Sequence, residues 1–300
     1  MKVLISGACG FIGSHVVDLL LKEGHTILCL DDLSSGLRSN LPEKIDFAEV
    51  NVGNWYDLVA EFHDFEPEAV IHLAAQPSIC DSFDNPIRDG YVNVMGSLNI
   101  IRACQKIGTQ RLVFSSTSAV YSECDSAISE DYPRLPQTPY GISKLAAESY
   151  IRLLMPDNSV VMRFGNVYGP RQVPLGENQV VPRMIHHFEK GADFVIHGDG
   201  TQRRDMVYVD DVARACVASL TGTPGVYNIA SGKSTSINGI ASIIELIYDV
   251  PGYAWNHDEQ EDSRRVVELN VTKAKEVLSW QPTVSLIEGL QKTVEWWKTQ

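Results

Sequence analysis

Short apolar runs alternate with segments of helical spacing through the first half of this chain, and this alternation limits the fold more than any other feature. Apolar runs of strand length stand at 2–6, 26–31, 69–75, 111–116 and 159–164, with helical patterns between them at 15–24, 56–63, 92–108 and 140–155. Buried strands separated by helices are typical of parallel strands joined by crossovers. The sequence therefore predicts an α/β fold built on a doubly wound parallel sheet.

The second half of the chain has a different character. Its loops are longer and carry Gly, Pro and Asn, as in 165–179 and 196–205, and its strands are brief. Three hundred residues also exceed one usual hydrophobic core. We therefore expect a smaller mixed α/β lobe beside the sheet. The predicted division assigns 1–164 plus 206–237 to a cofactor-binding sheet domain, and 165–205 plus 238–300 to a substrate-binding lobe.

The overall charge and composition limit the classes of partner. A formal net charge of −13 argues against nucleic acid or an anionic membrane as a general partner. No apolar run approaches the length of a membrane span, and the first residues read as a strand and its loop instead of a signal peptide. The six cysteines form no C-x-x-C pair and the eight histidines show no metal-binding spacing. We expect a cytoplasmic protein with reduced thiols and no protein-bound metal.

Three glycines follow the first predicted strand and open the first helix: Gly7, Gly10 and Gly13. Glycines there permit a tight turn, close approach of a pyrophosphate to the backbone, and close packing of helix on strand, while the helix N-terminus offers N–H groups to phosphates. Asp31 ends the second strand, where a carboxylate accepts both ribose hydroxyls and repels a 2′-phosphate. The pattern predicts NAD in preference to NADP, with Asp32 as a competing candidate. A plain tight turn followed by solvated acids is the alternative interpretation.

A tyrosine and a lysine four residues apart, Tyr140 and Lys144, project from one face of a predicted helix. A free tyrosine has a pKa of about 10, too high for a base at neutral pH. A nearby ammonium group and a nicotinamide cation would both favour the phenolate. Such pairs are common on amphipathic helices. Here, however, the pair follows a dinucleotide loop and the strand end 115–122, which is rich in hydroxyls, and this context favours a catalytic role.

Seven segments occur in a fixed order along nearly the whole chain. They are GACGFIGSH, IHLAAQ, FSSTSAVY, TPYGISKLAAE, RFGNVYGPRQ, GDGTQRRDMVYVDDVARA and SWQPTVSLIEGL. In these segments the chain resembles the extended short-chain dehydrogenase/reductase family, which comprises NAD-dependent nucleotide-sugar epimerases and dehydratases on a Rossmann fold. Within that family it is most similar to the UDP-glucose 4-epimerases.

The resemblance implies roles for individual residues. Thr117 would be the hydroxyl partner of Tyr140 and Lys144 in a catalytic triad. The NAD site would comprise Gly7, Gly10, Phe11, Ile12, Gly13, Asp31, Asp32, Ser35, Gly36, Asn51, Val52, Leu73, Ala74, Ala75, Asn93, Ser115, Tyr140 and Lys144. The UDP-sugar would meet Thr117, Tyr140, Asn166, Val181, Arg204 and Arg265. The helices expected at 92–108 and 140–155 would pair with their two-fold mates in a homodimer.

The chain departs from the family pattern at two positions, and its C-terminal arginines can be aligned with the pattern in two ways. Asn51 stands where many members carry an aspartate near the adenine. Gly165 stands where hexose epimerases often have a phenylalanine, which suggests a roomier sugar pocket. Near the C-terminus, either Arg264 or Arg265 could meet the diphosphate, and an exposed charged strand is the competing interpretation of that stretch.

The residues that follow Thr117 bear on the type of reaction. Dehydratases of the resembled family carry an Asp-Glu pair after the hydroxyl, and its decarboxylases carry a glutamate two residues past it. Here these places hold Ser118 and Ala119, and the nearest acid is Glu123. We therefore expect NAD-dependent epimerisation of a UDP-hexose at C4 through a transient 4-keto sugar. A UDP-uronic acid decarboxylase, a sugar-nucleotide dehydratase, a simple dehydrogenase and a non-catalytic NAD-binding regulator remain as alternatives, and the sugar is open.

Overall fold

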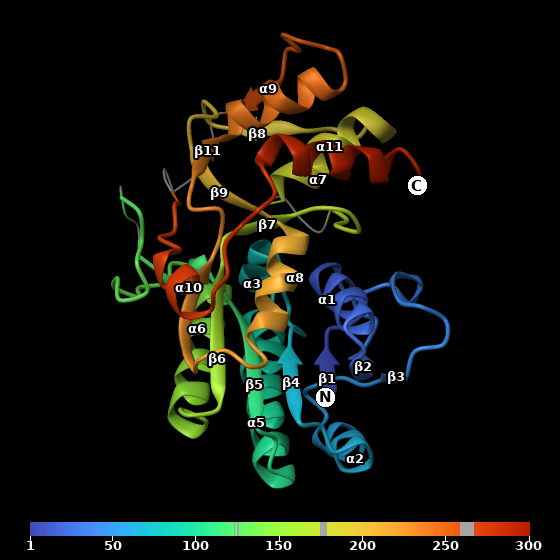
Figure 1. Cartoon of the computed structure of the whole chain (residues 1–300). Coiled ribbons are helices and arrows are strands. Elements are labelled where there is room, and N and C mark those ends of the chain that lie inside the picture. Colours follow the sequence, from blue (N-terminus) through green and yellow to red (C-terminus); the bar gives the residue numbers. More distant parts are fainter. Residues whose placement is uncertain (123, 125, 175–178, 259–266) are drawn as a thin grey trace.

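The computed structural model describes residues 1–122, 124, 126–174, 179–258 and 267–300. Its centre is a seven-stranded sheet with the order β10-β6-β5-β4-β1-β2-β3, in which every neighbouring pair is parallel (Figure 1). The strands are β1 (Lys2–Ser6), β2 (Thr26–Asp31), β3 (Phe47–Glu49), β4 (Ala69–His72), β5 (Arg111–Thr117), β6 (Ser159–Phe164) and β10 (Gly225–Ile229). The predicted doubly wound parallel sheet is confirmed. The sequence did not indicate β3, which has three residues and no buried run.

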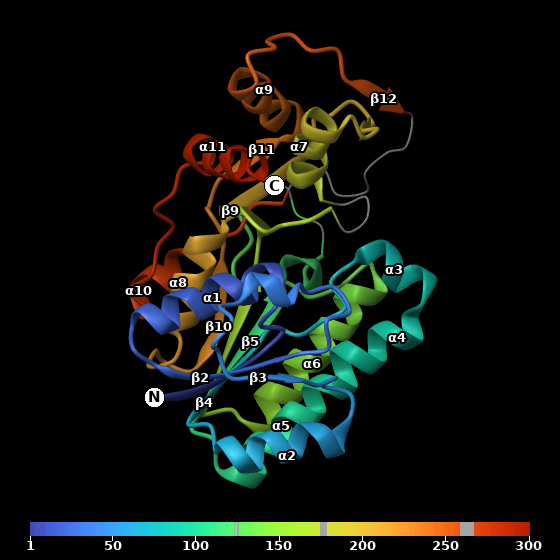
Figure 2. The ribbon, with the colours of Figure 1, turned by 90° about the vertical axis from the view of Figure 1, so that its right-hand side faces the viewer.

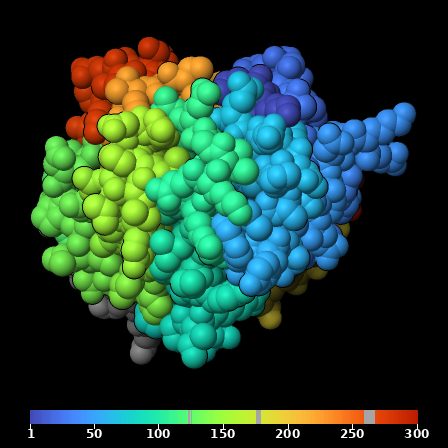
Figure 3. Space-filling view, turned by 90° about the horizontal axis from the view of Figure 1, so that it is seen from below, coloured from blue at the N-terminus to red at the C-terminus, as the bar shows by residue number. Residues whose placement is uncertain are grey.

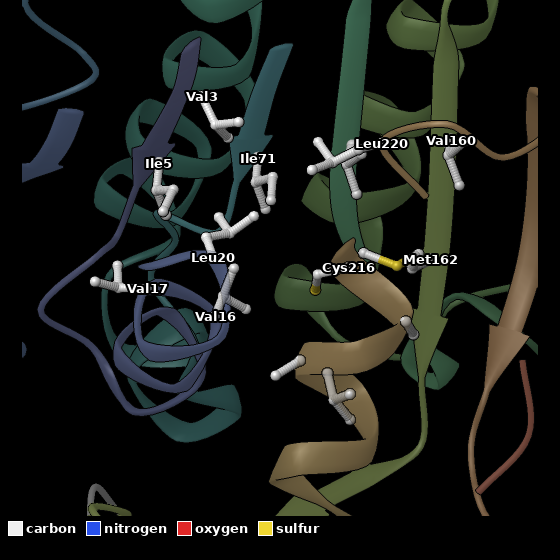
Figure 4. Packing of buried hydrophobic residues seen from close by; sticks show 14 of the residues in the cluster. Val3, Ile5, Val16, Val17, Leu20, Ile71, Val160, Met162, Cys216 and Leu220 are labelled. Carbon is white, nitrogen blue, oxygen red and sulfur yellow. The ribbon is translucent and has the colours of Figure 1, made fainter. Parts of the chain in front are cut away.

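Helices cover both faces of this sheet. On one face, α1 (Phe11–Lys22) packs beside α8 (Val209–Ala218), and Figure 4 shows Val16 and Leu20 of α1 against Ile71 of β4. On the other face lie α2 (Trp55–Phe65), α5 (Gly96–Ile107) and α6 (Pro139–Leu154). The side chains of β1 alternate between the two layers, because Val3 belongs to the first core and Leu4 to the second.

The connection between β4 and α5 is more elaborate than the sequence predicted. It contains the short helices α3 (Ile79–Asp84) and α4 (Pro86–Gly90), followed by a π-helical turn (Tyr91–Met95) that runs into α5. Asn85 caps α4, because its side-chain oxygen accepts the N–H of Arg88 at 3.0 Å, and Pro86 occupies the first helical position. Two single turns of 3-10 helix lie elsewhere, at Arg38–Asn40 and Ser118–Val120.

A smaller lobe lies beyond the carboxyl ends of the sheet strands (Figures 1 and 2). It contains the three-stranded sheet β11-β9-β7 and the parallel pair β12-β8. The strands are β7 (Asn166–Tyr168), β8 (Val195–His197), β9 (Arg203–Tyr208), β11 (Ser234–Ser236) and β12 (Asn256–Asp258). The helices α7 (Val180–Lys190), α9 (Ile237–Ile247) and α11 (Leu286–Trp297) share one apolar core with β9. The predicted small mixed lobe is therefore present.

The chain returns to the larger domain near its C-terminus. Helix α10 (Thr272–Val277) packs on β10, and Ala274, Leu278 and Trp280 belong to the same core as β1 and α1. The predicted division placed this stretch in the lobe, and we propose that residues 272–280 be counted with the sheet domain instead. Within the described residues, no helix combines the length and apolar character needed to cross a membrane.

Candidate functional site

A pocket opens at the carboxyl ends of β1, β2, β4 and β5, on the side of the sheet that faces the lobe. Most residues predicted to bind the cofactor line it. They are Gly7, Gly10, Phe11, Ile12, Gly13, Asp31, Asp32, Ser35, Val52, Leu73, Ala74, Ala75, Ser115, Tyr140 and Lys144. Residues 7 to 144 are far apart in sequence, and the parallel sheet brings them together because all its strands end at this edge.

The glycine turn at one end of the pocket has no room for side chains. Gly7 has φ +74°, and a Cβ there would lie 2.6 Å from the backbone nitrogen of Ala74. A Cβ on Gly13 would lie 2.0 Å from the Gly7 carbonyl oxygen. Helix α1 begins after Gly10 with no side-chain cap, so a ligand can meet the N–H groups of its first turn. This cradle fits the pyrophosphate of a dinucleotide.

Two acids stand next to this turn and differ in their surroundings. Asp31 is buried, and its carboxylate accepts the N–H groups of Cys9 and Leu33, each at 2.9 Å. Burial raises the pKa of Asp31, whereas these hydrogen bonds lower it. Asp32 is half-buried, and its Oδ2 accepts the side-chain N–H of Asn51 at 2.8 Å. Both aspartates line the pocket, whereas Asn51 does not line it and holds Asp32 in place.

The structure gives Arg38 a role within its own loop. Its guanidinium donates to the carbonyl oxygens of Leu41, Pro42 and Glu43 at 3.2 to 3.4 Å, and it stacks on the Phe47 ring. A 2′-phosphate beside Asp31 would need a positive countercharge, and Arg38, seven residues after Asp31, is a candidate by its place in the sequence. The Arg38 guanidinium is instead bonded to carbonyl groups of its own loop. The residues beside Asp31 therefore fit NAD.

Two further predicted cofactor residues act behind the pocket wall. A Cβ on Gly36 would lie 2.8 Å from the Cys9 carbonyl carbon, so Gly36 allows its loop to pack on the glycine turn. Asn93 is buried, accepts the N–H of Gln76 at 2.9 Å and donates to the Gln76 carbonyl at 3.2 Å. It thereby fixes the end of the loop that contributes Leu73 and Ala74 to the pocket.

The three predicted catalytic side chains come together at the other end. Helix α6 begins at Pro139 because the Thr138 hydroxyl accepts the N–H of Gly141 at 3.0 Å. Tyr140 and Lys144, on the first turns of this helix, both line the pocket. Thr117 ends β5 and its side chain forms a hydrogen bond with that of Tyr140.

The protonation of this group differs from the expectation in one respect. Burial raises the pKa of Tyr140 to about 12, although the hydrogen bond with Thr117 lowers it. The groups that shift the pKa of Tyr140 are Thr117 and Asp89 besides burial itself, and the expected lowering by Lys144 is not among these effects. Burial also lowers the pKa of Lys144 to about 8, against the opposing effects of Asp89 and Glu148.

The predicted substrate residues of the lobe do not line this pocket. Asn166 begins β7, Val181 lies in the lobe core, and Arg204 lies on β9 and donates to the Arg203 carbonyl at 2.9 Å. Their contact with a sugar nucleotide stays a prediction. Three residues lie outside the described part of the chain: Glu123, Arg264 and Arg265.

Gly165 lies in a closely packed place. A Cβ at this position would lie 2.9 Å from the Asp205 carbonyl oxygen and 3.1 Å from the Ala230 Cβ. Gly165 therefore permits close packing between β6 and its neighbours. It does not line this pocket, and its effect on a sugar site stays a prediction.

Sequence analysis missed one loop that forms a wall of the pocket. Arg171, Gln172 and Val173 line it, and the Arg171 guanidinium forms an ion pair with Asp18 of α1 at 2.7 Å. His15, also on α1, hydrogen bonds to the Pro170 carbonyl at 3.0 Å. Arg171 and Gln172 belong to the segment RFGNVYGPRQ, one of the seven that carry the family resemblance. No pattern of neighbouring residues indicates that this segment contacts α1. The other unpredicted lining residues are Ser34, Leu37, Asn40, Val50, Pro77, Val92, Ser116, Phe164 and Gln179.

Comparison with known proteins gives consistent results. A family model described as the NAD dependent epimerase/dehydratase family matches residues 3–230. A putative UDP-glucose 4-epimerase from Methanocaldococcus jannaschii is 37% identical over 99% of this chain and 98% of its own length. A UDP-glucose 4-epimerase from Mycolicibacterium smegmatis is 37% identical over 100% and 99%. The structure of UDP-glucose 4-epimerase with UDP-glucose from Thermotoga maritima has a TM-score of 0.95 at 37% identity, over 100% and 99% of the two chains.

Relatives with other activities are also found. They include a dTDP-D-glucose 4,6-dehydratase from Mus musculus and a UDP-glucuronic acid decarboxylase from Xenopus tropicalis. Similarity alone therefore leaves the type of reaction to be argued from the site.

Proposed function

This chain belongs to the NAD-dependent epimerase/dehydratase family, as its sequence segments predicted, and we propose that it epimerises a UDP-hexose at C4 through a transient 4-keto sugar. One observation carries the proposal. Among the described residues that line the pocket, the only carboxylates are Asp31 and Asp32, which stand beside the glycine turn. The end with Tyr140 and Lys144 offers hydroxyl groups and an amine, and no acid that could protonate a departing hydroxyl.

The cofactor would be held by the glycine turn and the first turn of α1 at its pyrophosphate, with Asp31 at the ribose. When bound, NAD supplies the position that accepts hydride from C4 and returns it. Pocket residues Ser115, Tyr140 and Lys144 lie at the opposite end from Asp31 on strand β5 and helix α6. The two ends therefore suit the two halves of one dinucleotide.

Side chains of this protein would remove the proton of the sugar 4-hydroxyl and return it. Tyr140 would take the proton of the sugar 4-hydroxyl, and Thr117, which hydrogen bonds with the Tyr140 side chain, would orient that oxygen. Lys144 carries an ammonium below its pKa of about 8, and this charge would lower the cost of forming the phenolate. Tyr140 alone, with its pKa of about 12, is a weak base, so the neighbouring positive charge is necessary for the mechanism.

Two buried acids on or near α6 that the structure describes already have hydrogen-bond partners. Glu148 forms an ion pair with Arg163 at 2.7 Å, and Asp89 is buried in a network with Asn93. Neither lines the pocket. This arrangement favours epimerisation over dehydration and over decarboxylation, both of which are found among the relatives.

The test is a panel of UDP-sugars incubated with NAD-loaded protein in heavy water, with products separated by chromatography and weighed by mass spectrometry. We expect a product with every atom of the substrate, changed only at C4, with no deuterium at C4 or C5. Elimination would exchange the C5 hydrogen, and decarboxylation would lose C6. Loss of water, loss of carbon dioxide or net accumulation of NADH would contradict the proposal.

A single substitution tests the base. Tyr140→Phe removes only the phenolic oxygen, so turnover should fall by about a hundredfold or more while NAD stays bound. Turnover within a few-fold of the unmodified protein would contradict the assignment. Thr117→Val should slow the reaction and leave its stereochemical outcome unchanged, because it removes the group that orients the sugar oxygen.

We also propose that the protein works as a homodimer in the cytoplasm. Helices α5 and α6 pack against each other, and Figure 3 shows segments of both, teal and yellow-green, side by side on the surface. Five large apolar side chains, on α6 or directly before α5, are 41 to 75% exposed and offer apolar area for a second copy of the chain. They are Met95, Ile142, Tyr150, Leu153 and Leu154.

A further inference from the structure

The inner face of α6 carries more than the two predicted catalytic side chains. Tyr140, Lys144 and Glu148 follow at intervals of four residues and so lie along one stripe. Lys144 is 2% exposed and Glu148 is 1% exposed. A buried charge is costly unless another charge or several hydrogen bonds compensate it. The partners of these two groups are therefore informative.

Glu148 is compensated mainly by Arg163. The Arg163 guanidinium donates from Nε to Oε1 at 3.0 Å and from Nη2 to Oε2 at 2.7 Å, and the Ser116 hydroxyl donates to Oε1 as well. Such a two-bond contact between guanidinium and carboxylate is the strongest ion-pair geometry available to side chains. Glu148 and Arg163 together are neutral, so Lys144 requires a further anion nearby.

Asp89 of α4 is the other buried acid, among the described residues, whose charge acts on Lys144. It is 1% exposed, and its Oδ1 accepts the side-chain N–H of Asn93 at 2.9 Å. The hydroxyl of Ser143, the residue before Lys144, also stabilises the Asp89 carboxylate as a donor. This hydroxyl has one hydrogen, which it donates either to Asp89 or to the Tyr140 carbonyl at 2.9 Å. Asp89 is thus attached to the helical turn that carries both predicted catalytic side chains.

The other described groups near Lys144 are an aromatic ring, a neutral histidine and a carboxylate that is already paired. The ammonium lies 4.5 Å from the centre of the Phe114 ring on β5. His72 of β4 is buried, and burial together with Lys144 lowers its pKa to about 3, so it is neutral. Glu148 contributes through space but is bonded to Arg163.

We propose that Asp89 is a positioning residue for the reaction: its buried carboxylate keeps Lys144 in the ammonium form and, through Ser143, holds the turn that carries Tyr140. This rests on the proposed function, because it assigns Asp89 to the same proton-transfer site. No sequence pattern indicated it, since Asp89 precedes Tyr140 by fifty-one residues on a separate helix.

The directions of the pKa shifts agree with this geometry. Burial lowers the pKa of Lys144 to about 8, and Asp89 is the larger of the two charges that raise it. Burial raises the pKa of Asp89, while Ser143, Lys144 and Asn93 lower it. A lysine is charged below its pKa and loses the charge as pH rises through it. Removal of the Asp89 charge therefore moves this loss to lower pH.

The first test is the pH profile of kcat for Asp89→Asn, which keeps the shape and a hydrogen-bond acceptor. We expect the alkaline limb near pH 8 to move down by about one unit or more, since an opposite charge nearby shifts a pKa by about 1 to 3 units. Asp89→Glu should restore much of the limb. Asp84→Asn, on exposed α3, is the matched control for loss of one negative charge and should leave the profile unchanged.

The second test does not depend on turnover. The protein is loaded with NAD and labelled with ¹³C at the Cε of lysine. The Lys144 resonance is assigned by its absence in Lys144→Arg. We expect this resonance to titrate near pH 8 in the unmodified protein and at lower pH in Asp89→Asn. Ser143→Ala removes the hydrogen bond but keeps the carboxylate, so it should lower kcat without moving the titration. An unchanged Lys144 titration in Asp89→Asn would overturn the proposal.

The two hypotheses fail in different ways. If the resonance shifts as expected but no UDP-sugar is epimerised, the role of Asp89 stands and the proposed function is wrong. If the unmodified protein epimerises a UDP-sugar, but Asp89→Asn changes neither the alkaline limb of the kcat profile nor the titration of Lys144, the proposed role of Asp89 is wrong.

Discussion

Replacement of Arg163 by methionine should be among the most destabilising single changes in this protein. Arg163 lies on β6 and is 0% exposed. Besides its two bonds to Glu148, it donates to the Tyr121 hydroxyl and to the Glu130 carbonyl, each at 2.9 Å. Methionine is also long and flexible, but it leaves the buried Glu148 carboxylate with the Ser116 hydroxyl as its one remaining side-chain hydrogen-bond donor among the described residues. Removing one partner of a buried pair costs about 3–5 kcal/mol.

The double variant Arg163→Met/Glu148→Leu should recover much of this loss. It leaves no lone buried charge, and Tyr121 keeps its hydrogen bond to Asn228 at 2.7 Å. The Glu130 carbonyl loses a donor and the Ser116 hydroxyl loses an acceptor, at about 1 kcal/mol each. The double variant should therefore be about 2 kcal/mol less stable than the unmodified protein, and about 1–3 kcal/mol more stable than Arg163→Met.

Urea unfolding of the NAD-loaded protein, followed by circular dichroism and tryptophan fluorescence, measures these differences. With a slope of about 3 kcal/mol/M, the single variant should lose about 1 M or more in its midpoint. The two signals must coincide for the midpoints to be compared as free energies. If the double variant is no more stable than Arg163→Met, the uncompensated charge is not the source of the loss and the reasoning fails.

Three further predictions concern the cofactor and the assembly. Gly13→Ala should weaken NAD binding more than tenfold in calorimetry, because its Cβ would lie 2.0 Å from the Gly7 carbonyl oxygen. Gly90→Ala is the control and should bind NAD normally, because a Cβ at Gly90 would lie more than 4 Å from every described atom beyond its chain neighbours and the backbone of its own helix. NAD should bind more tightly than NADP because Asp31 lines the pocket and the guanidinium of Arg38 is bonded to carbonyl groups of its own loop; equal affinities would contradict this. Leu153→Lys, at a side chain 75% exposed, should convert a dimer to a monomer in sedimentation at micromolar concentration; a monomeric unmodified protein would refute the proposed assembly.

The parallel sheet and the glycine turn could be predicted because their signals are local. Buried strands such as 69–72 appear as apolar runs, and the turn needs glycine wherever a Cβ would strike backbone, as at Gly7 and Gly13. The pair Tyr140 and Lys144 could be found for the same reason, since residues four apart on a helix must share a face. In each case the physical constraint acts over a few residues and therefore leaves a pattern in the sequence.

Other features had no local pattern. The fold pairs the Asn51 side chain with Asp32, and the expected contact of Asn51 with the cofactor stays a prediction. The structure also places the Asp205 backbone against Gly165, which the sequence did not indicate. The loop at Arg171 reaches the pocket because Asp18 and His15 of α1 hold it there. None of these outcomes depends on near neighbours in the chain.

The sequence by itself determined five strands of the parallel sheet, the helices between them, the dinucleotide turn and the two catalytic candidates on α6. Only the tertiary structure decided which charged groups are buried around those candidates. The pairing of Glu148 with Arg163 depends on the register of β6 against β5, and the effect of the Asp89 charge on Lys144 depends on the path of α4 past α6. The physical reason is that a buried charge is stable only where the fold places an opposite charge or several hydrogen-bond partners beside it. These partners come from distant parts of the chain, so no short sequence pattern indicates them.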